Sequence, residues 1–298
     1  MSKVLGLKQK EWLSVIALSL ALALSIFVLQ RFGVKSVSIK GKPHFESFIG
    51  AGELDNPMAV AVYRDFVAVT SSADGRVKLY NYDGDPVSQV KLPNNGAYPA
   101  SLAFDNDGTL YIGDLTDKAV YKSSVLSGSD ALEKLKIKAL QPLAMAVNGD
   151  DLLVFDGKSH RLLKISGDLK TLNAIADNDI KVSYANGIYS DNQRLYLSDS
   201  NGRRVLRFSA TGQYTGSLKD FGLPRGLAVD SLKRLHVVDT FSHAVKVFGE
   251  DGKFLFKYGK EGNGRGKFYF PNSLAIDSSK GKIFIADKGN NRVQVWGW

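Results

Sequence analysis

Short apolar strands alternate with polar turns from residue 44 onward, and the pattern repeats six times. Each repeat opens with an apolar run after a proline or a small residue: PMAVAV (57–62), PASLAF (99–104), PLAMAV (142–147), ANGIYS (185–190), PRGLAV (224–229) and PNSLAI (271–276). Successive runs begin 42, 43, 43, 39 and 47 residues apart. Two further strands follow each run, and most repeats add a weaker fourth. Four-stranded units of this length predict an all-β fold, a six-bladed β-propeller with antiparallel blades.

The last repeat provides only three strands before Trp298, so its blade lacks an outer strand. The segment HFESFIG (44–50), ahead of the first repeat, has the pattern of FLFKYG (254–259), a fourth strand. An unpaired strand edge invites pairing with other chains, and propellers remove it by closing the ring. We therefore expect residues 44–50 to lie antiparallel to RVQVWGW (292–298) and to close the last blade.

A second pattern occupies the N-terminus, where residues 12–30 read WLSVIALSLALALSIFVLQ without a charge. As a helix this segment is about 28 Å long, close to the thickness of the hydrocarbon core of a bilayer. Cleavage as a signal peptide remains an alternative, but the small-residue site at Ala21–Ala23 lies inside the apolar run. We expect a retained, single-pass transmembrane helix that contacts lipid.

This helix divides the chain into a tail (residues 1–11), the anchor (12–30), a juxtamembrane linker (31–43) and the propeller (44–298). Lysines flank the helix on both sides, so the charge rule alone does not orient it. The 11-residue tail carries three lysines and the terminal amine, which are costly to move across a membrane. We expect a plasma-membrane protein with a cytoplasmic N-terminus and the propeller outside the cytoplasm.

Charge and cysteine content narrow the function. The net charge is +9, yet residues 1–42 alone carry seven basic groups against Glu11, a net of +6, which leaves +3 for the other 256 residues. The propeller is therefore only mildly basic, and we expect no nucleic-acid partner. The chain has no cysteine, which excludes disulfides, cysteine-ligated metals and cysteine nucleophiles.

The repeats resemble one known family. The segments DKGNNRVQVW (287–296), DTFSHAVKVF (239–248) and DSNGRRVLRF (199–208) are similar to NHL repeats. The first two repeats depart from the motif, because DLTDKAVYK (114–122) lacks the asparagine and Ser71 stands where the aspartate is expected. The resemblance implies the same six-bladed propeller, and it extends over residues 44–298.

The polar motif residues have structural roles that need no ligand. An aspartate ends the second strand of most repeats, where its carboxylate can accept backbone N–H groups of the turn; these are Asp114, Asp156, Asp199, Asp239 and Asp287. Arg161, Arg204 and Arg292 begin the third strand, and we expect them to bridge to the neighbouring blade.

The four histidines test an enzymatic alternative. Peptidyl-hydroxyglycine lyases have an NHL-like propeller with a histidine-bound zinc, and zinc catalysis needs three converging ligands. His160 and His243 share one repeat position, which places them in different blades, and His236 falls inside a second strand. His44 precedes the first repeat. We therefore expect no metal and no cofactor.

A lactonase-like site is the other enzymatic alternative, since gluconolactonase-type propellers hold a metal through Glu, Asn and Asp in the central channel. Asn56, Asn186 and Asn272 lie at the starts of innermost strands, but no glutamate shares that position. Signature motifs of other catalytic classes are absent. A metal-dependent lyase or lactonase-like enzyme stays the alternative, and we expect a protein that is not an enzyme.

The remaining hypothesis is a protein-binding scaffold in a cell-envelope complex. Its partners are other envelope or membrane proteins, bound through the loops around the channel mouth. The residues that we expect on this surface are Asn56, Asn186, Arg203, Arg225, His243 and Asn272.

Overall fold

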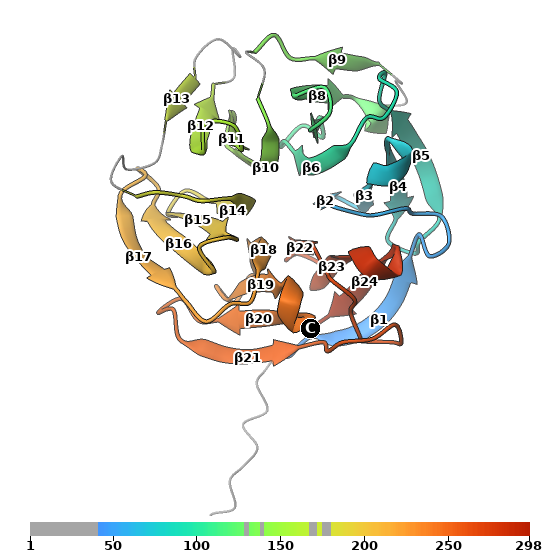
Figure 1. The fold of residues 1–298 in the computed structure, drawn as a ribbon. Coiled ribbons are helices and arrows are strands. Elements are labelled where there is room, and N and C mark those ends of the chain that lie inside the picture. Colours follow the sequence, from blue (N-terminus) through green and yellow to red (C-terminus); the bar gives the residue numbers. More distant parts are fainter. Residues whose placement is uncertain (1–40, 128–130, 138–139, 167–171, 175–179) are drawn as a thin grey trace, which may run out of the picture. The chain divides into compact units, whose positions relative to one another are not determined.

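The computed structural model describes residues 41–127, 131–137, 140–166, 172–174 and 180–298. Pro43–Trp298 form one compact unit, in which the described strands make six four-stranded sheets arranged in a ring (Figure 1). The predicted all-β, six-bladed propeller is confirmed. The expected membrane helix at 12–30 lies outside the described residues, and no described helix is long and apolar enough to cross a membrane.

The first three blades follow one another along the chain, each running from the channel outward. Blade 1 contains β2 (Val60–Tyr63), β3 (Phe66–Ser71), β4 (Arg76–Asn81) and β5 (Pro86–Lys91). Blade 2 contains β6 (Pro99–Phe104), β7 (Leu110–Asp114), β8 (Ala119–Ser123) and β9 (Leu132–Lys134). Blade 3 contains β10 (Pro142–Asn148), β11 (Asp151–Asp156), β12 (Arg161–Ile165) and β13 (Leu172–Ala174).

The next two blades keep this order, and the last one changes it. Blade 4 contains β14 (Ala185–Ser190), β15 (Arg194–Asp199), β16 (Arg204–Ser209) and β17 (Tyr214–Leu218). Blade 5 contains β18 (Pro224–Val229), β19 (Leu235–Asp239), β20 (Ala244–Phe248) and β21 (Phe254–Tyr258). Blade 6 contains β22 (Ser273–Asp277), β23 (Lys282–Asp287), β24 (Arg292–Gly297) and β1 (His44–Ile49). Short 3₁₀ turns are η1 (Ser72–Asp74), η2 (Val125–Ser127), η3 (Thr240–Ser242) and η4 (Lys288–Asn290).

Blade 6 is closed by the two ends of the propeller. β1 pairs antiparallel with β24, with His44 opposite Gly297 and Ile49 opposite Val293. Every residue of β24 is buried, because β1 covers its outer edge. The predicted closure by the N-terminal strand is confirmed, and it leaves no open edge at the C-terminal strand.

The core lies between blades. Second and third strands are buried on both faces, because each blade is sandwiched between two others; Val67 and Val69 of β3, for example, share a cluster with Phe284 and Val293 of blade 6. Outer strands such as β5 expose alternate residues. Each fully buried Val or Phe side chain contributes about 1.5–3 kcal/mol, so packing between blades holds the ring together.

The motif aspartates are buried acceptors, as predicted. Asp199 Oδ1 accepts the backbone N–H groups of Ser183 and Tyr184 at 3.0 and 3.2 Å, and Asp114 Oδ1 accepts that of Tyr98 at 3.0 Å. Each carboxylate thus fixes the connection that leads into its own blade. Ser71 replaces the aspartate in blade 1 and accepts the N–H of Asp55 through its hydroxyl at 2.9 Å.

The predicted role of the motif arginines is wrong. Arg204 Nε donates to Asp199 of the same blade at 3.0 Å, and Arg292 Nε donates to Asp287 at 2.9 Å. Their terminal nitrogens bind carbonyl groups of the incoming connections, as Arg292 does with Lys267 at 3.2 Å. These connections fold back over the third strand, so the arginine meets its own blade first. Arg161 is exposed.

Neighbouring blades are instead joined by hydroxyl groups. Ser200 and Thr240 follow the motif aspartate directly, and they donate to the carbonyls of Pro224 and Pro271 at 2.6 and 2.7 Å. Ser72 makes the equivalent bond to Pro99. Pro99 and Pro224 begin the inner strand of the next blade, and Pro271 lies two residues before it, so the bonds fix the spacing of the inner strands.

Candidate binding face at the channel mouth

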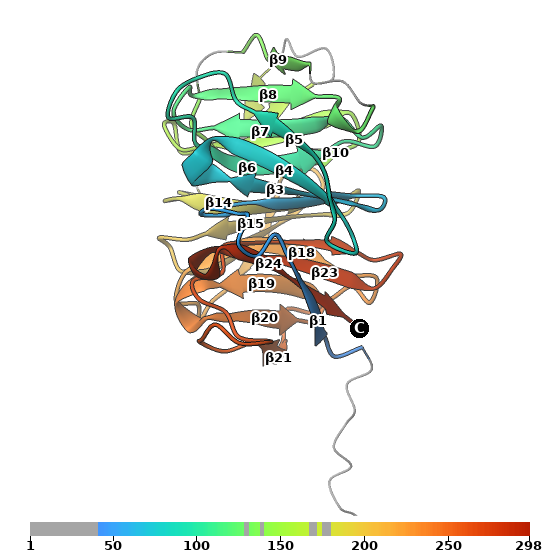
Figure 2. The same cartoon turned by 90° about the vertical axis from the view of Figure 1, so that its right-hand side faces the viewer.

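The ring has two ends with different connections. We call "mouth face" the end that carries the turns between second and third strands and the connections into the inner strands. We call "hairpin face" the end that carries the turns between first and second strands. Figure 2 shows the 3₁₀ turns η1, η3 and η4 at one end and the C-terminus at the other. His44 pairs with Gly297, so the chain joins the propeller at the hairpin face.

One repeat position on the mouth face has a left-handed backbone in all six blades. Its φ values lie between 48° and 67° at Gly75, Lys118, His160, Arg203, His243 and Asn291. Glycine and asparagine suit this conformation, and other residues cost about 1–2 kcal/mol there. The histidines of this position therefore sit in a turn that the fold repeats in every blade, in line with the predicted structural role.

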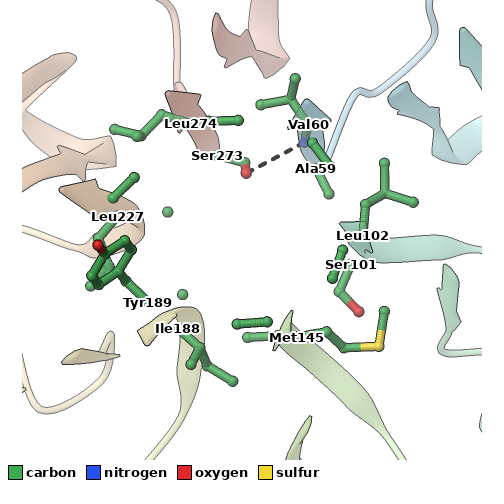
Figure 3. Close-up of a pocket in the computed structure, with 18 of the residues that line it drawn as sticks. Ala59, Val60, Ser101, Leu102, Met145, Ile188, Tyr189, Leu227, Ser273 and Leu274 are labelled. Carbon is green, nitrogen blue, oxygen red and sulfur yellow. Dashed lines mark hydrogen bonds between the residues drawn. The ribbon is translucent and has the colours of Figure 1, made fainter. Parts of the chain in front are cut away.

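The residues that line the central channel are mostly small or aliphatic, and none is charged. The channel has a volume of about 390 Å³ and is lined by residues in or next to all six inner strands, among them Ala59, Ser101 and Ser273 (Figure 3). No Asp, Glu or His is among its lining residues. Throughout the described residues, no three His, Asp or Glu side chains gather as metal ligands. A lactonase-type metal site would lack its carboxylate donors in this channel.

The three predicted asparagines hold the mouth together. Asn272 is buried, and its Nδ2 donates to the carbonyl of Met58 across the junction of blades 6 and 1. The side-chain amide of Asn186 lies 2.9 Å from the Ser200 hydroxyl. Asn56 Nδ2 donates to the Tyr98 hydroxyl at 2.8 Å. Their amides thus bind neighbouring protein groups around the rim of the channel.

Arg225, also predicted for this surface, lies at the start of β18 and is half-buried. Its Nε atom is buried without a hydrogen-bond partner. Burial lowers the pKa of Arg225, while the hydroxyls of Tyr184 and Tyr98 act in the opposite direction. Tyr98 precedes blade 2, which lies across the ring from blade 5 (Figure 1). Arg225 stands at the mouth-face end of the inner strand, next to Gly226 of the channel lining.

A second cation lies beside it. Lys288 follows the last residue of β23, and burial together with the charge of Arg225 lowers its pKa. Among the described residues, no carboxylate lies within ion-pair distance of either cation. Lys246, by contrast, has such a partner in Asp239 at 2.8 Å.

The other two predicted residues lie farther from the channel. Arg203 Nε donates to the carbonyl of Phe221 at 3.0 Å, so this side chain joins blade 4 to the connection into blade 5. His243 Nδ1 accepts the backbone N–H of Phe270 at 3.1 Å. The neutral ring therefore carries its proton on Nε2.

His243 belongs to an exposed group of rings that we call the aromatic cluster: Phe241, His243, Tyr269 and Phe270. The His243 ring stacks on the Tyr269 ring with their centroids 5.6 Å apart, and its centroid lies 4.6 Å from that of the Phe270 ring. Phe241, Tyr269 and Phe270 are 61%, 42% and 36% exposed. Exposed aromatic groups with a polar rim mark interaction sites, so this cluster is the strongest binding feature of the mouth face.

The backbone of Phe270 is strained. Its φ of 46° is left-handed, which is a genuine outlier for a bulky residue and costs of the order of 1–3 kcal/mol. This conformation places the Phe270 ring against His243 and Phe241. Strain of this kind persists where the surrounding structure enforces it, often at binding sites.

Sequence reasoning missed Lys288, Phe241, Tyr269 and Phe270. Two signals were available in the repeat. Lys288 takes the position of Ser72, Ser200 and Thr240 next to the strand end, and Phe241 takes a turn position that holds polar or small residues in the other blades. A charge or a large ring at a position of small residues points to a local role.

His236 is the buried histidine of a polar network in blade 5. Its Nε2 donates to Asp230 at 3.0 Å, and its Nδ1 lies 3.2 Å from the Tyr258 hydroxyl. Arg234 Nε donates to the same carboxylate at 2.6 Å. The predicted packing role is confirmed, because the side chain is fully buried.

Comparison with known sequences agrees with the fold. Residues 227–297 match a family model described as a 6-bladed beta-propeller. The chain is 27% identical over 95 residues to Protein brain tumor of Drosophila melanogaster, which is 32% of this chain and 9% of that protein. It is 32% identical over 79 residues to NHL repeat-containing protein 3 of Homo sapiens, or 26% and 22% of the two chains. The matched segments thus span less than a quarter of either relative.

Solved structures show the same fold at low identity. A virginiamycin B lyase from Staphylococcus aureus superposes with a TM-score of 0.62 at 13% identity, over 86% of this chain and 100% of that chain. A gluconolactonase from Xanthomonas campestris superposes with a TM-score of 0.66 at 17% identity, over 86% of this chain and 94% of that chain. A protein of unknown function from Bacteroides thetaiotaomicron superposes with a TM-score of 0.67 at 17% identity, over 86% of this chain and 76% of that chain. The chain is a six-bladed propeller with distant NHL-repeat homologues.

Proposed function

We propose that this protein is a membrane-tethered NHL-type propeller that binds other envelope proteins through its mouth face and so acts as an assembly scaffold. The observation that carries the proposal is the aromatic cluster, in which Phe241, Tyr269 and Phe270 are exposed side by side. Large rings of this kind dominate the energy of protein interfaces, because they offer much apolar area at little loss of side-chain entropy.

The place where the chain joins the propeller supports this assignment. His44 pairs with Gly297 beside the C-terminus, so β1 begins at the hairpin face, whereas the turns and connections that carry the cluster belong to the mouth face. The proposed tether of residues 12–30 and the linker 31–43 lead directly into this strand along the chain. The proposed location is the plasma membrane, with the tail of residues 1–11 in the cytoplasm and the propeller outside it.

The alternative of a metal-dependent lyase or lactonase-like enzyme has less support. The similar solved structures include a lyase and a lactonase, yet the lining of this channel offers neither carboxylate nor imidazole. Binding without catalysis, and without a cofactor or nucleic acid, accounts for the exposed groups that the mouth face presents.

Photocrosslinking in intact cells tests the scaffold. A photoreactive phenylalanine analogue replaces Phe241 on the mouth face or, as a control, Leu232 on the hairpin face, which is 52% exposed. We expect a discrete crosslinked protein of the envelope at position 241 and none at position 232. Equal crosslinking at both positions, or none at position 241, would sink the proposal. Protease treatment of intact cells tests the location, since an extracytoplasmic propeller is accessible from outside.

A further inference from the structure

The mouth of the channel carries positive charge that nothing in the described structure neutralises. The neighbouring carboxylates are already bound. The Asp239 carboxylate accepts the backbone N–H groups of Gly222 and Leu223, the Ser242 hydroxyl and the Lys246 ammonium. The Asp287 carboxylate accepts the backbone N–H of Tyr269 and Nε of Arg292. Arg225 and Lys288 form no ion pair and donate no side-chain hydrogen bond among the described residues.

Such an arrangement is costly unless a ligand completes it. A buried donor without an acceptor costs about 1–3 kcal/mol, and more when it is charged. Arg225 has a buried Nε without a partner, and its charge acts on Lys288. A bound anion would accept from both groups. Because the site is partly shielded from water, each of these hydrogen bonds would be stronger than on an open surface.

Neutral donors lie next to the cations. Tyr184 directly precedes β14 on the mouth face, and the Tyr98 hydroxyl on the same rim accepts Asn56 Nδ2 at 2.8 Å. Its own proton can therefore be donated to a ligand. The site thus offers one planar guanidinium, one ammonium and hydroxyl donors, which suits a single small anion.

The aromatic cluster borders this site. The carbonyl of Asn272 accepts the N–H of Gly226, directly after Arg225, at 3.0 Å. Phe270 lies two residues before Asn272 along the chain. The inner ends of blades 5 and 6 therefore bring a cationic site and an apolar ring surface side by side.

We propose that the mouth of the channel binds the C-terminal carboxylate of a partner polypeptide, through Arg225 and Lys288, with the last apolar side chain of the partner on the aromatic cluster. A guanidinium group matches a carboxylate in a planar, two-pronged geometry. Phosphate-rich ligands call for several cations, whereas this site has two beside exposed rings. The inference deepens the proposed scaffold function and rests on it.

Ligand-observed saturation-transfer NMR on the full-length protein tests the site. The probe is N-acetylphenylalanine, which joins a carboxylate to an aromatic ring, and its matched control is N-acetylphenylalaninamide. We expect saturable binding of the acid and about tenfold weaker binding of the amide. Arg225→Gln should weaken the acid about tenfold, and Lys288→Gln should weaken it less. Arg265→Gln, an exposed arginine on a mouth-face connection, should leave binding unchanged, and thermal unfolding establishes that each variant is folded.

Three results would overturn the inference: equal binding of acid and amide, binding of the acid that survives Arg225→Gln, or inorganic phosphate binding about tenfold more tightly than the acid. The last result would make the site a phosphate site. Crosslinking at position 241 with no preference for the acid would leave the scaffold standing without this site. Acid binding without any crosslinked protein would instead reject the scaffold.

Discussion

The hairpin face and the mouth face are built from the same repeat, yet they differ in how their polar groups are paired. On the hairpin face, Asp105, Asp191 and Asp230 accept the backbone N–H groups of their own turns, and Asp191 and Asp230 also pair with arginines. On the mouth face, Arg225 and Lys288 have no counter-ion among the described residues, and the aromatic cluster is exposed. The first arrangement stabilises the fold, and the second leaves groups available to a ligand.

This difference implies opposite responses to mutation. Removing a group whose partners lie within the protein should lower the free energy of unfolding and leave ligand binding unchanged. Removing a group without partners should leave the free energy of unfolding unchanged or raise it, and should weaken ligand binding alone. Selection for function often retains such destabilising residues.

Ring closure should have the largest effect, because both faces depend on it. Deletion of residues 44–49 removes β1 and exposes the edge of β24 and the side chains beneath it. We expect the loss of several kcal/mol, a large part of the stability of an ordinary domain, together with aggregation. Urea unfolding and size-exclusion chromatography measure both effects. Deletion of residues 1–40 is the control, and an unchanged transition after deletion of residues 44–49 would contradict the closure.

Asp230→Asn should have the next largest effect. It removes the buried carboxylate that binds Arg234 and His236. Breaking a buried ion pair from one side costs about 3–5 kcal/mol, which urea unfolding detects. Asp251→Asn, at an exposed carboxylate in a hairpin turn, should leave the urea transition nearly unchanged, because surface ion pairs contribute little. Binding of N-acetylphenylalanine should be the same in folded samples of both variants.

The same network predicts a dependence of stability on pH. Burial lowers the pKa of His236 below its usual 6.5, although Asp230 opposes this shift. As the pH falls below 6.5, the unfolded chain takes up a proton before the folded protein does. Stability should therefore be constant above this pH and fall below it by up to about 1.4 kcal/mol per pH unit, until the pH reaches the pKa of the folded state.

The variant His236→Gln isolates this contribution. Asp230, Arg234 and Tyr258 surround the ring, and the pKa of Asp230 is lowered, so that carboxylate titrates in a more acidic range. The difference in unfolding free energy between wild type and variant should change between pH 5 and pH 7. A constant difference would show that His236 is not held neutral.

Arg225→Met should have the smallest effect on stability, and with the opposite sign. Removing a half-buried charge without a counter-ion should leave the free energy of unfolding unchanged or raise it by about 1 kcal/mol. Arg204→Met is the matched control, because its guanidinium donates to the buried Asp199, and it should cost about 2 kcal/mol. A loss of 2 kcal/mol in Arg225→Met would mean that its charge has a partner within the protein.

Much of the fold could be predicted because the repeat is strict. The spacing of PASLAF, PLAMAV and PRGLAV fixed the number of blades, and the pattern of HFESFIG fixed the closing strand. The motif aspartates were recognised as acceptors because their position at a strand end restricts what they can bind. The expectation for Arg292 failed, since its partner Lys267 lies in a connection that folds back over the strand, and spacing does not encode such a fold.

The site was predicted only in part, for a physical reason. Arg225 stands in the inner strand, whose place follows from the repeat. Tyr269 and Phe270 stand in a connection of irregular length, and the left-handed backbone of Phe270 cannot be read from a residue type that disfavours it. The membrane anchor at residues 12–30 and the location of the propeller stay predictions.

The pairing of β1 with β24 also determines when the ring can close during synthesis. His44 and Gly297 are neighbours in the fold, but a ribosome adding about 5–20 residues per second makes them roughly 12–50 s apart. During that time β1 has no partner strand, while the blades that follow it along the chain are synthesised and fold. Glu46 places a charge in this strand, of the kind that discourages premature association, and later pairs with Lys282. The ring is thus completed last, by the strand of the propeller that is made first.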